Sequence, residues 1–293
     1  MNTLKTSNKD SNIDIDFDTN KDLTFIPLSS SSKGNCLFLS YNNTKILIDV
    51  GMTCKKVKER LASIGVNLCD IDGIFVTHHH TDHIAGLDVI YRNYNIPIYA
   101  TEKTWQYILR HNKIKDVKQS HINYVYTYEH IFLNDLFIKA FNVPHDACCT
   151  VGYSVFLNGK EGYKVSIATD FGCVTEEILD NLKDTNLLFL ESNHDIEMLK
   201  NGKYPKDLKE RVLGKRGHIS NTTAGELISA IYHKDLDYIY LGHLSEDNNI
   251  PLIAYDTVCN ILECNNILVN KDVCLKVADR TLISEKIKIT LHK

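Results

Sequence analysis

The alternation of apolar and polar positions predicts a protein in which strands and helices follow one another. Helical spacing of apolar residues, with charges between them, predicts helices at residues 53–64, 84–90, 175–183, 205–213, 222–233 and 250–264. Short apolar runs predict strands at residues 23–28, 36–41, 45–49, 72–77, 136–143, 151–157, 163–169, 186–191, 237–242 and 272–278. This alternation is typical of the α/β class.

The chain has the size and composition of one large domain. It has 293 residues, of which 43% are hydrophobic, and this is ample for a core. Residues 1–22 are rich in Asn, Asp, Lys, Ser and Thr with only scattered apolar positions. We therefore expect a disordered tail at 1–22 and a folded domain at 23–293.

Cysteine usage and hydropathy bear on location. No run of about 18 apolar residues and no charged-then-apolar leader is present, so we expect a cytoplasmic protein without a membrane segment. The nine cysteines have no regular spacing, which favours reduced thiols over a disulfide framework. The sequence gives no prediction of oligomeric state.

Charge is unevenly spread. The net charge of −4 does not indicate a nucleic-acid-binding protein. However, residues 206–216 hold five basic side chains and only two acidic ones. This stretch is interpreted either as a solvated helix face or as a contact for a phosphate backbone, through Lys215 and Arg216 among others.

The most informative motif is the histidine-rich run at residues 77–83. His78 and His80 are two positions apart, so one extended segment can direct both imidazoles at one ion. Asp82 and His83 follow at once and can serve a neighbouring ion. Imidazoles mixed with a carboxylate suit zinc or a similar divalent metal. The alternative is a metal-free surface loop.

This motif resembles the signature of the metallo-β-lactamase superfamily. Further matches follow in the family's order, each where an apolar run gives way to a loop: Asp49, His145, Asp170 and His243. The resemblance implies a four-layer αββα sandwich, with the metal site at the edge of its two sheets. Asp49, which closes an apolar strand ahead of Gly51, would support the metal loop.

The resemblance also implies a role for each ligand. His78, His80 and His145 would bind one divalent ion, Asp82, His83 and His243 a second, and Asp170 would bridge them. Zinc is the default, with manganese or iron as alternatives. His79 matches a variable position of the motif and is interpreted as a residue that supports the ligands or as a packing residue. The adjacent Cys148 and Cys149 would chelate one ion poorly and are also interpreted as packing residues.

Two further segments point to catalysis. His218 stands in a loop ahead of a helix for which Thr223 and Glu226 fit a capping box, a placement suited to donating a proton. His218 and the strand-end Glu191 resemble a histidine and glutamate of the ribonuclease Z branch, which implies that His218 is the general acid and Glu191 orients it. Asp82 completes the expected catalytic set.

Substrate contacts are expected from small polar residues. The loop at residues 29–35 is rich in serine and suits an anion such as phosphate, through Ser31, Ser32 and Asn35. An ordinary flexible turn is the alternative. His194 and Asn221, beside the Glu191 and His218 motifs, are further candidates for substrate contact, with a structural role as the alternative for His194.

The combination of motifs most closely resembles the WalJ (YycJ) group, associated with metal-dependent 5′-to-3′ exonuclease activity on DNA. Asp170 and His243 are 73 positions apart, too close for the domain that β-CASP nucleases insert there. No Gly/Pro-rich arm of the ribonuclease Z type is visible, which argues against tRNA maturation. A DNA phosphodiesterase is therefore the first hypothesis. The alternatives are a carbon-centre hydrolase such as a lactonase, thioesterase or lactamase, a ribonuclease Z-like RNA nuclease, and a non-catalytic regulator.

Overall fold

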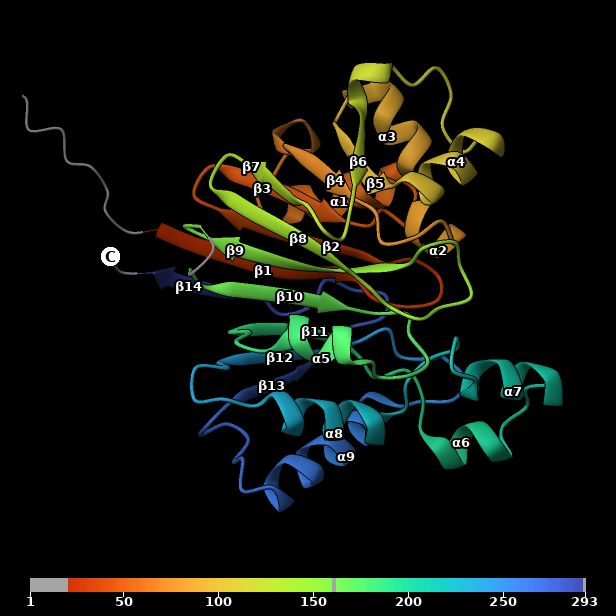
Figure 1. Ribbon diagram of the computed structural model, residues 1–293, viewed down its shortest axis with the longest axis vertical. Coiled ribbons are helices and arrows are strands. Elements are labelled where there is room, and N and C mark those ends of the chain that lie inside the picture. The colour runs from red at the N-terminus through yellow and green to blue at the C-terminus, as the bar shows by residue number, and fades with distance from the viewer. Residues whose placement is uncertain (1–20, 160–161, 292–293) are drawn as a thin grey trace, which may run out of the picture.

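Two facing seven-stranded sheets form the middle of the molecule (Figure 1). The computed structural model describes residues 21–159 and 162–291. The first sheet has the order β14 (Ile287–Leu291), β1 (Lys21–Ser29), β2 (Cys36–Tyr41), β3 (Thr44–Ile48), β4 (Gly73–Phe75), β5 (Ile98–Thr101) and β6 (Ile122–Val125). The second has the order β13 (Cys274–Val277), β12 (Tyr238–Gly242), β11 (Leu187–Glu191), β10 (Lys164–Ala168), β9 (Val151–Leu157), β8 (Leu136–Asn142) and β7 (His130–Leu133).

Helices cover the outer face of each sheet. The elements on the side of the first sheet are α1 (Cys54–Ser63), η1 (Leu68–Asp70), α2 (Thr81–Ile84), α3 (Leu87–Tyr94), α4 (Glu102–Arg110) and η2 (Gln119–His121). Those on the side of the second sheet are α5 (Glu176–Leu182), α6 (Ile196–Asn201), α7 (Lys206–Leu213), α8 (Asn221–Ile231) and α9 (Pro251–Cys264). The predicted αββα sandwich is therefore confirmed.

Three apolar clusters hold these layers together. One lies between the sheets and includes the fully buried rings of Phe75, Tyr153 and Phe189. A second joins the first sheet to α1, α3 and α4 through residues such as Leu61 and Trp105. The third joins the second sheet to α5, α8 and α9. Burial of apolar area in all three is the main stabilising contribution.

Strand direction brings the site residues to one edge. In the first sheet β3 and β4 are parallel neighbours, and in the second β10, β11 and β12 are parallel neighbours. Their carboxyl ends carry Asp49, the histidine-rich loop, Asp170, Glu191 and His243. Parallel strands place their carboxyl ends at a common edge, where open α/β sheets bind ligands.

Several predicted boundaries were wrong for local reasons. β4 ends at Phe75 and not at Thr77, because the Thr77 N–H is bonded to a side chain and not to a neighbouring strand. The helix predicted at 84–90 is divided into α2 and α3. Gly86 intervenes, and a Cβ there would lie 2.2 Å from the Met52 carbonyl oxygen.

The ends of the domain and the cap of α8 also differ from expectation. β1 begins at Lys21, since residues 21 and 22 pair with β14, so the domain starts before residue 23. The remaining part of the predicted tail, residues 1–20, lies outside the described residues. The cap of α8 is Ser220, whose hydroxyl accepts from the Thr223 N–H at 3.1 Å, and not the predicted Thr223 and Glu226 pair.

Some elements had not been predicted at all, namely β5, β6, β7, β14, α4, α6, η1 and η2. Among the described residues, no helix combines the length and apolar character needed to cross a membrane. All nine cysteines are free thiols.

Candidate metal centre

The histidine-rich loop is held in place by hydrogen bonds to Asp49. The two carboxylate oxygens of Asp49 accept hydrogen bonds from the N–H and the hydroxyl of Thr77, each at 2.8 Å. Oδ2 also accepts from Nδ1 of His83 at 2.7 Å. Asp49 therefore orients the ring of His83 through Nδ1, so that Nε2 is directed toward the other potential ligands.

The glycine after Asp49 is required by close backbone contact. A Cβ on Gly51 would lie 1.6 Å from the carbonyl oxygen of Asp82, so any side chain would displace the loop. On the other side, the N–H of Asn35 donates to the same carbonyl at 2.8 Å. The position of Asp82 is thus set by two neighbouring segments.

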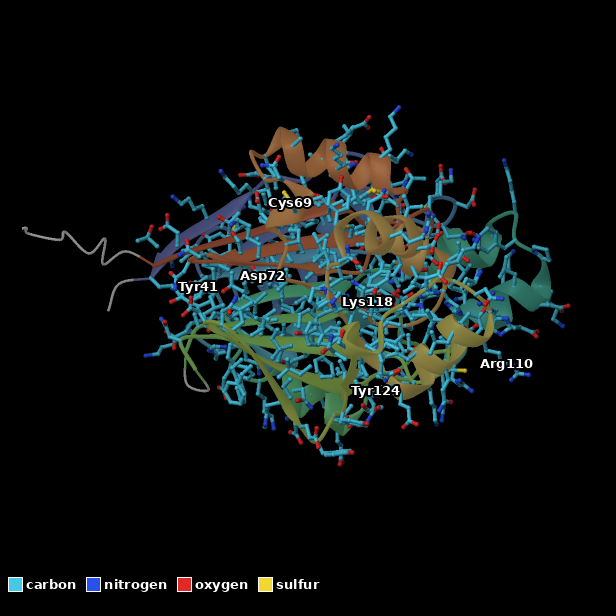
Figure 2. The ribbon with its side chains drawn as sticks, turned by 90° about the horizontal axis from the view of Figure 1, so that it is seen from above. Tyr41, Cys69, Asp72, Arg110, Lys118 and Tyr124 are labelled. Carbon is cyan, nitrogen blue, oxygen red and sulfur yellow. The ribbon has the colours of Figure 1, made fainter. Side chains whose placement is uncertain are left out.

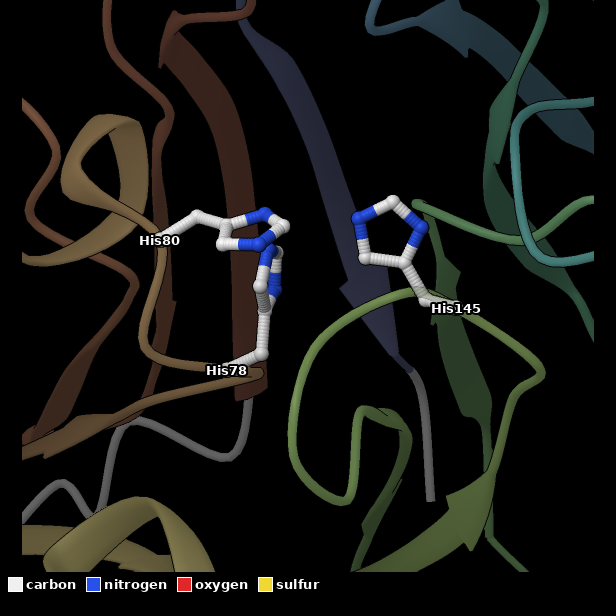
Figure 3. Close-up of side chains that lie close together, drawn as sticks. All are labelled: His78, His80 and His145. Carbon is white, nitrogen blue, oxygen red and sulfur yellow. The ribbon is translucent and has the colours of Figure 1, made fainter. Parts of the chain in front are cut away.

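Three histidines form the first group of potential ligands. His78 and His80 lie on the loop after β4, and His145 lies beyond the end of β8 (Figure 3). One ligand nitrogen from each lies within 4.8 Å of the others. His145 is oriented by Nδ1, which lies 3.2 Å from the carbonyl oxygen of Gly217. This spacing suits a single ion bound by three imidazoles.

A second group lies beside the first. Asp82, His83 and His243 also bring one ligand atom each within 4.8 Å of the others. Asp170 lies between the groups: its Oδ1 is 3.8 Å from Nε2 of His145 and 3.5 Å from Nε2 of His243. Its Oδ2 is 3.4 Å from Nε2 of His83. The structure therefore brings together all seven residues that the sequence analysis had selected as ligands.

The chemistry of these atoms fits bound cations. Nε2 of His78, Nε2 of His243 and Oδ2 of Asp170 are buried and have no hydrogen-bond partner among the described residues. Unpartnered buried polar atoms are costly, and a metal ion would satisfy them. Burial and neighbouring imidazoles hold the pKa of His78 well below its usual value, which favours the neutral ligand form. The clustered imidazoles and carboxylates are the ligand types that divalent metal ions take.

Three strand-end residues adopt an uncommon backbone conformation. Asp49, Asp170 and His243 have φ angles of 58°, 60° and 54°, in the left-handed region. Asp and His tolerate this region better than bulky or β-branched residues. The sharp turn after each strand directs the side chain toward the cluster of potential ligands. Backbone strain of this kind is common at functional sites.

Glu191 links the metal cluster to a histidine outside both ligand triads. Its Oε1 accepts hydrogen bonds from Nδ1 of His218 at 2.7 Å and from Nδ1 of His243 at 2.9 Å. Its Oε2 accepts from the N–H of Phe171 at 3.1 Å. Burial opposes ionisation of Glu191, but His218 and the hydrogen bonds outweigh it and lower the carboxyl pKa. Burial likewise opposes protonation of His218, and the Glu191 carboxylate raises its pKa above the ordinary value.

An open cavity lies over this cluster. Its lining includes His80, Asp82, Asp170, His218 and His243. Residues of α7 and the turn before it, namely Tyr204, Leu208, Arg211 and Val212, line it as well. A substrate that occupies this cavity would therefore lie against both α7 and the clustered ligands.

Only some of the residues predicted to contact substrate line this cavity. Ser32 lines it, whereas Ser31 lies in a neighbouring hollow. Asn35 supports the metal loop, with Nδ2 3.1 Å from Nε2 of His83. His194 and Asn221 are buried and line no part of it, and substrate contact by them stays a prediction.

The predicted basic residues also lie away from the cavity. Lys215 and Arg216 are exposed, and neither lines it. Nε of Arg216 donates to the carbonyl oxygen of His145 at 2.8 Å, so Arg216 supports a ligand loop. Contact of Lys215 with substrate stays a prediction.

Sequence reasoning missed two residues of this site, Asp146 and Ser30. Asp146, with Oδ1 3.3 Å from Nε2 of His145, is held by Nε of Arg211 at 2.5 Å. Asp146 directly follows a predicted ligand, and this adjacency could have drawn attention to it. Ser30 was missed in favour of its neighbours, yet its hydroxyl accepts from the His243 N–H at 2.7 Å. Nothing local in the sequence indicates that contact, because it joins segments 213 positions apart.

The remaining interpretations concern His79 and the paired cysteines. His79 packs against Tyr107 with ring centroids 3.8 Å apart, as expected of a packing residue. Cys148 and Cys149 belong to none of the groups of potential ligands among the described residues. Cys148 is exposed, so the interpretation as a packing residue is wrong for it.

Comparison with known proteins agrees with this geometry. Residues 44–244 match the family model of the beta-lactamase superfamily domain. The chain is 35% identical over 244 residues to exodeoxyribonuclease YycJ of Bacillus anthracis, covering 82% of this chain and 89% of that protein. It is also 35% identical over 242 residues to exodeoxyribonuclease WalJ of Streptococcus pneumoniae, covering 80% and 86%.

A solved structure supports the fold. The metallo-beta-lactamase fold protein YhfI from Bacillus subtilis superposes with a TM-score of 0.65 at 12% identity, covering 90% of this chain and 99% of that one. Given the family match, the extended similarity to YycJ and WalJ and the shared fold, this chain belongs to the metallo-β-lactamase superfamily.

Proposed function

We propose that this protein is a metal-dependent phosphodiesterase that degrades DNA as a 5′-to-3′ exonuclease. Similarity to YycJ and WalJ, which extends over at least 80% of the chain, supports a nuclease within the superfamily. The observation that carries the proposal is the pair of His218 and Glu191 beside the clustered ligands. A carbon-centre hydrolase of the same fold needs no such acid.

We assign the ligands as two sets joined by one carboxylate. His78, His80 and His145 would hold one divalent ion, Asp82, His83 and His243 the other, and Asp170 would bridge them. Bound there, two such ions would lower the pKa of a shared water and neutralise charge on the phosphate. Zinc is the ion we propose from the histidine content, with manganese or iron as alternatives.

The protein's own residues supply the proton transfer. His218 would donate its Nε2 proton to the oxygen of the departing nucleotide, since its Nδ1 is already engaged by Glu191. Glu191 would hold the ring in place and stabilise its charged form. Arg211, which lines the cavity and is held by Asp146, would interact with a phosphate group entering the cavity.

We also propose that the protein acts in the cytoplasm. The nine free thiols and the DNA substrate suit a reducing compartment that contains the chromosome.

The test compares three substrates with one preparation of metal-loaded protein. These are a duplex labelled at its 5′ ends, a chromogenic phosphodiester, and a chromogenic lactone or thioester. We expect metal-dependent release of labelled nucleotides from the duplex and slower turnover of the phosphodiester. Efficient turnover of the lactone or thioester, with the duplex intact, would instead identify a carbon-centre hydrolase.

A further inference from the structure

A row of aromatic rings leads from the metal cluster onto the surface of α4. The ring of His79 lies 5.3 Å from that of the ligand His80, and 3.8 Å from Tyr107 on its other side. Tyr107 lies in turn 4.3 Å from the ring of His111. Exposure increases along the row, since His79 and Tyr107 are half-buried and His111 is exposed. We call His79, Tyr107 and His111 the aromatic row.

Helical spacing places basic residues along the same face. Lys103 and His111 lie four positions before and after Tyr107, and Arg110 lies three positions after it. Residues so spaced share one face of a helix. The other face of α4 carries Trp105 and Ile108, which are buried in the core. The aromatic row therefore lies on the solvent side of α4, flanked by positive charge.

The positive charge extends beyond the helix end. Lys113, Lys115 and Lys118 follow in the next loop, and all three side chains are exposed. Among the described residues, neither Lys103 nor Arg110 takes part in an ion pair. Both cations are therefore free to interact with a polyanion.

The position of α4 suits a substrate leaving the cavity. In two views at right angles, α4, α6 and α7 all lie on the right-hand side of the molecule, α4 with the first sheet and α6 and α7 with the second (Figure 1 and Figure 2). Arg110, labelled in Figure 2, is the last residue of α4. Residues of α7 and His80 both line the cavity, and the aromatic row begins at His79, directly beside His80. A chain longer than one nucleotide can thus continue from the metal cluster along α4.

We propose that the aromatic row and the cations beside it bind the single-stranded segment of DNA next to the bond being cut. Because Tyr107 is already stacked between His79 and His111, a base would stack on the exposed face of His111, which Tyr107 holds in place, and phosphates would face Lys103 and Arg110. Rings combined with a basic track are the common means of binding single strands without sequence preference. This inference rests on the proposed nuclease function and adds a binding surface outside the cavity.

The test measures binding of a labelled, phosphorothioate-substituted single strand of about twelve nucleotides to the metal-loaded protein. Each stacked base contributes roughly 1–3 kcal/mol, which corresponds to a change in Kd of about 5- to 150-fold. We expect Tyr107→Leu to weaken binding within that range and Tyr107→Phe, which keeps the ring, to restore it. His111→Ala should also weaken binding, and Lys103→Glu with Arg110→Glu should flatten its salt dependence.

Phe132→Leu serves as the matched control, because it removes an exposed ring from β7, which is an edge strand of the second sheet. Metal content is measured in each variant, since loss of Tyr107 could shift His79 and through it His80. The ratio of turnover on the oligonucleotide to turnover on a chromogenic phosphodiester should fall in Tyr107→Leu and stay at the wild-type value in Phe132→Leu.

Failure of this inference can be distinguished from failure of the proposed nuclease function. If the wild-type protein cleaves DNA but Tyr107→Leu and His111→Ala bind the single strand as tightly as wild type, the aromatic row is only a packing feature and the inference is wrong. If the wild-type protein cleaves no DNA with any divalent metal, the proposed function itself fails.

Discussion

The carboxylate of Glu191 accepts a hydrogen bond from Nδ1 of His218 at 2.7 Å, in a setting where Glu191 is fully buried. A buried carboxylate is costly unless it is paired, and this pairing also fixes the direction of the imidazole. The remaining nitrogen of His218 is left for the cavity that it lines. This relationship leads to the first two predictions.

Substitution of His218 by alanine should lower turnover on DNA by roughly 10²–10⁴-fold, the usual contribution of a positioned acid. The loss should be smaller with a nitrophenyl leaving group, which departs without a proton. Turnover numbers with both substrates, measured side by side, test this expectation. Metal content should remain at the wild-type level, and a variant that loses metal would show that His218 is a ligand.

Glu191→Gln should affect both partners of the carboxylate. The glutamine removes the charge that strengthens the bonds from Nδ1 of His218 and Nδ1 of His243, and it offers one acceptor oxygen where Glu191 uses two. We expect turnover to fall as in His218→Ala and metal affinity to drop by roughly 10- to 100-fold, the usual cost of losing a residue that orients a ligand. Titration with a metal chelator measures the second effect. Wild-type metal affinity would contradict the role assigned to the bond with His243.

Lys215 and Arg216 should behave differently when reversed to glutamate. Arg216→Glu removes the hydrogen bond to the His145 carbonyl, so it should weaken metal binding and slow turnover of every substrate. Lys215→Glu should weaken DNA binding alone, with the salt slope reduced by roughly 0.7–0.9 for each lost phosphate contact. Binding measured at several salt concentrations separates them. Equal loss in both variants would indicate that Lys215 supports the loop as well.

Lys164 should make stability depend on alkaline pH. Burial lowers the pKa of its amine from 10.5 to about 8 in the folded state. Between these values the unfolded chain holds the proton and the folded chain does not, so the free energy of unfolding rises with pH. The contribution of this one amine to the slope of the unfolding free energy against pH cannot exceed about 1.4 kcal/mol per pH unit. Denaturant unfolding of wild type, Lys164→Met and the exposed control Lys271→Met should show this rise reduced only in Lys164→Met.

The site was predictable where its residues stand at the ends of apolar strands. Asp49, Asp170 and His243 each follow such a run, and parallel strand ends meet at one edge. The layers followed from the family resemblance, because periodicity alone indicates only that strands and helices alternate.

What could not be predicted depends on contacts between distant segments. The split between α2 and α3 arises because Gly86 packs on the backbone near Met52, which the helical pattern of residues 84–90 does not reveal. The pairing of Asp146 with Arg211 joins positions 65 apart, and neither motif indicates the other. The aromatic row likewise needs the tertiary fold, because it joins the metal loop to α4.

The central claim is that a metal centre built from these seven ligands hydrolyses DNA. Its most direct test is to measure metal content and degradation of end-labelled DNA in the same preparations of wild type and Asp170→Ala. We predict two divalent ions per wild-type chain, activity that is lost on chelation and regained on adding metal, and loss of both properties in the variant. Wild-type protein without bound metal, or DNA degradation that persists after complete chelation, would contradict the account.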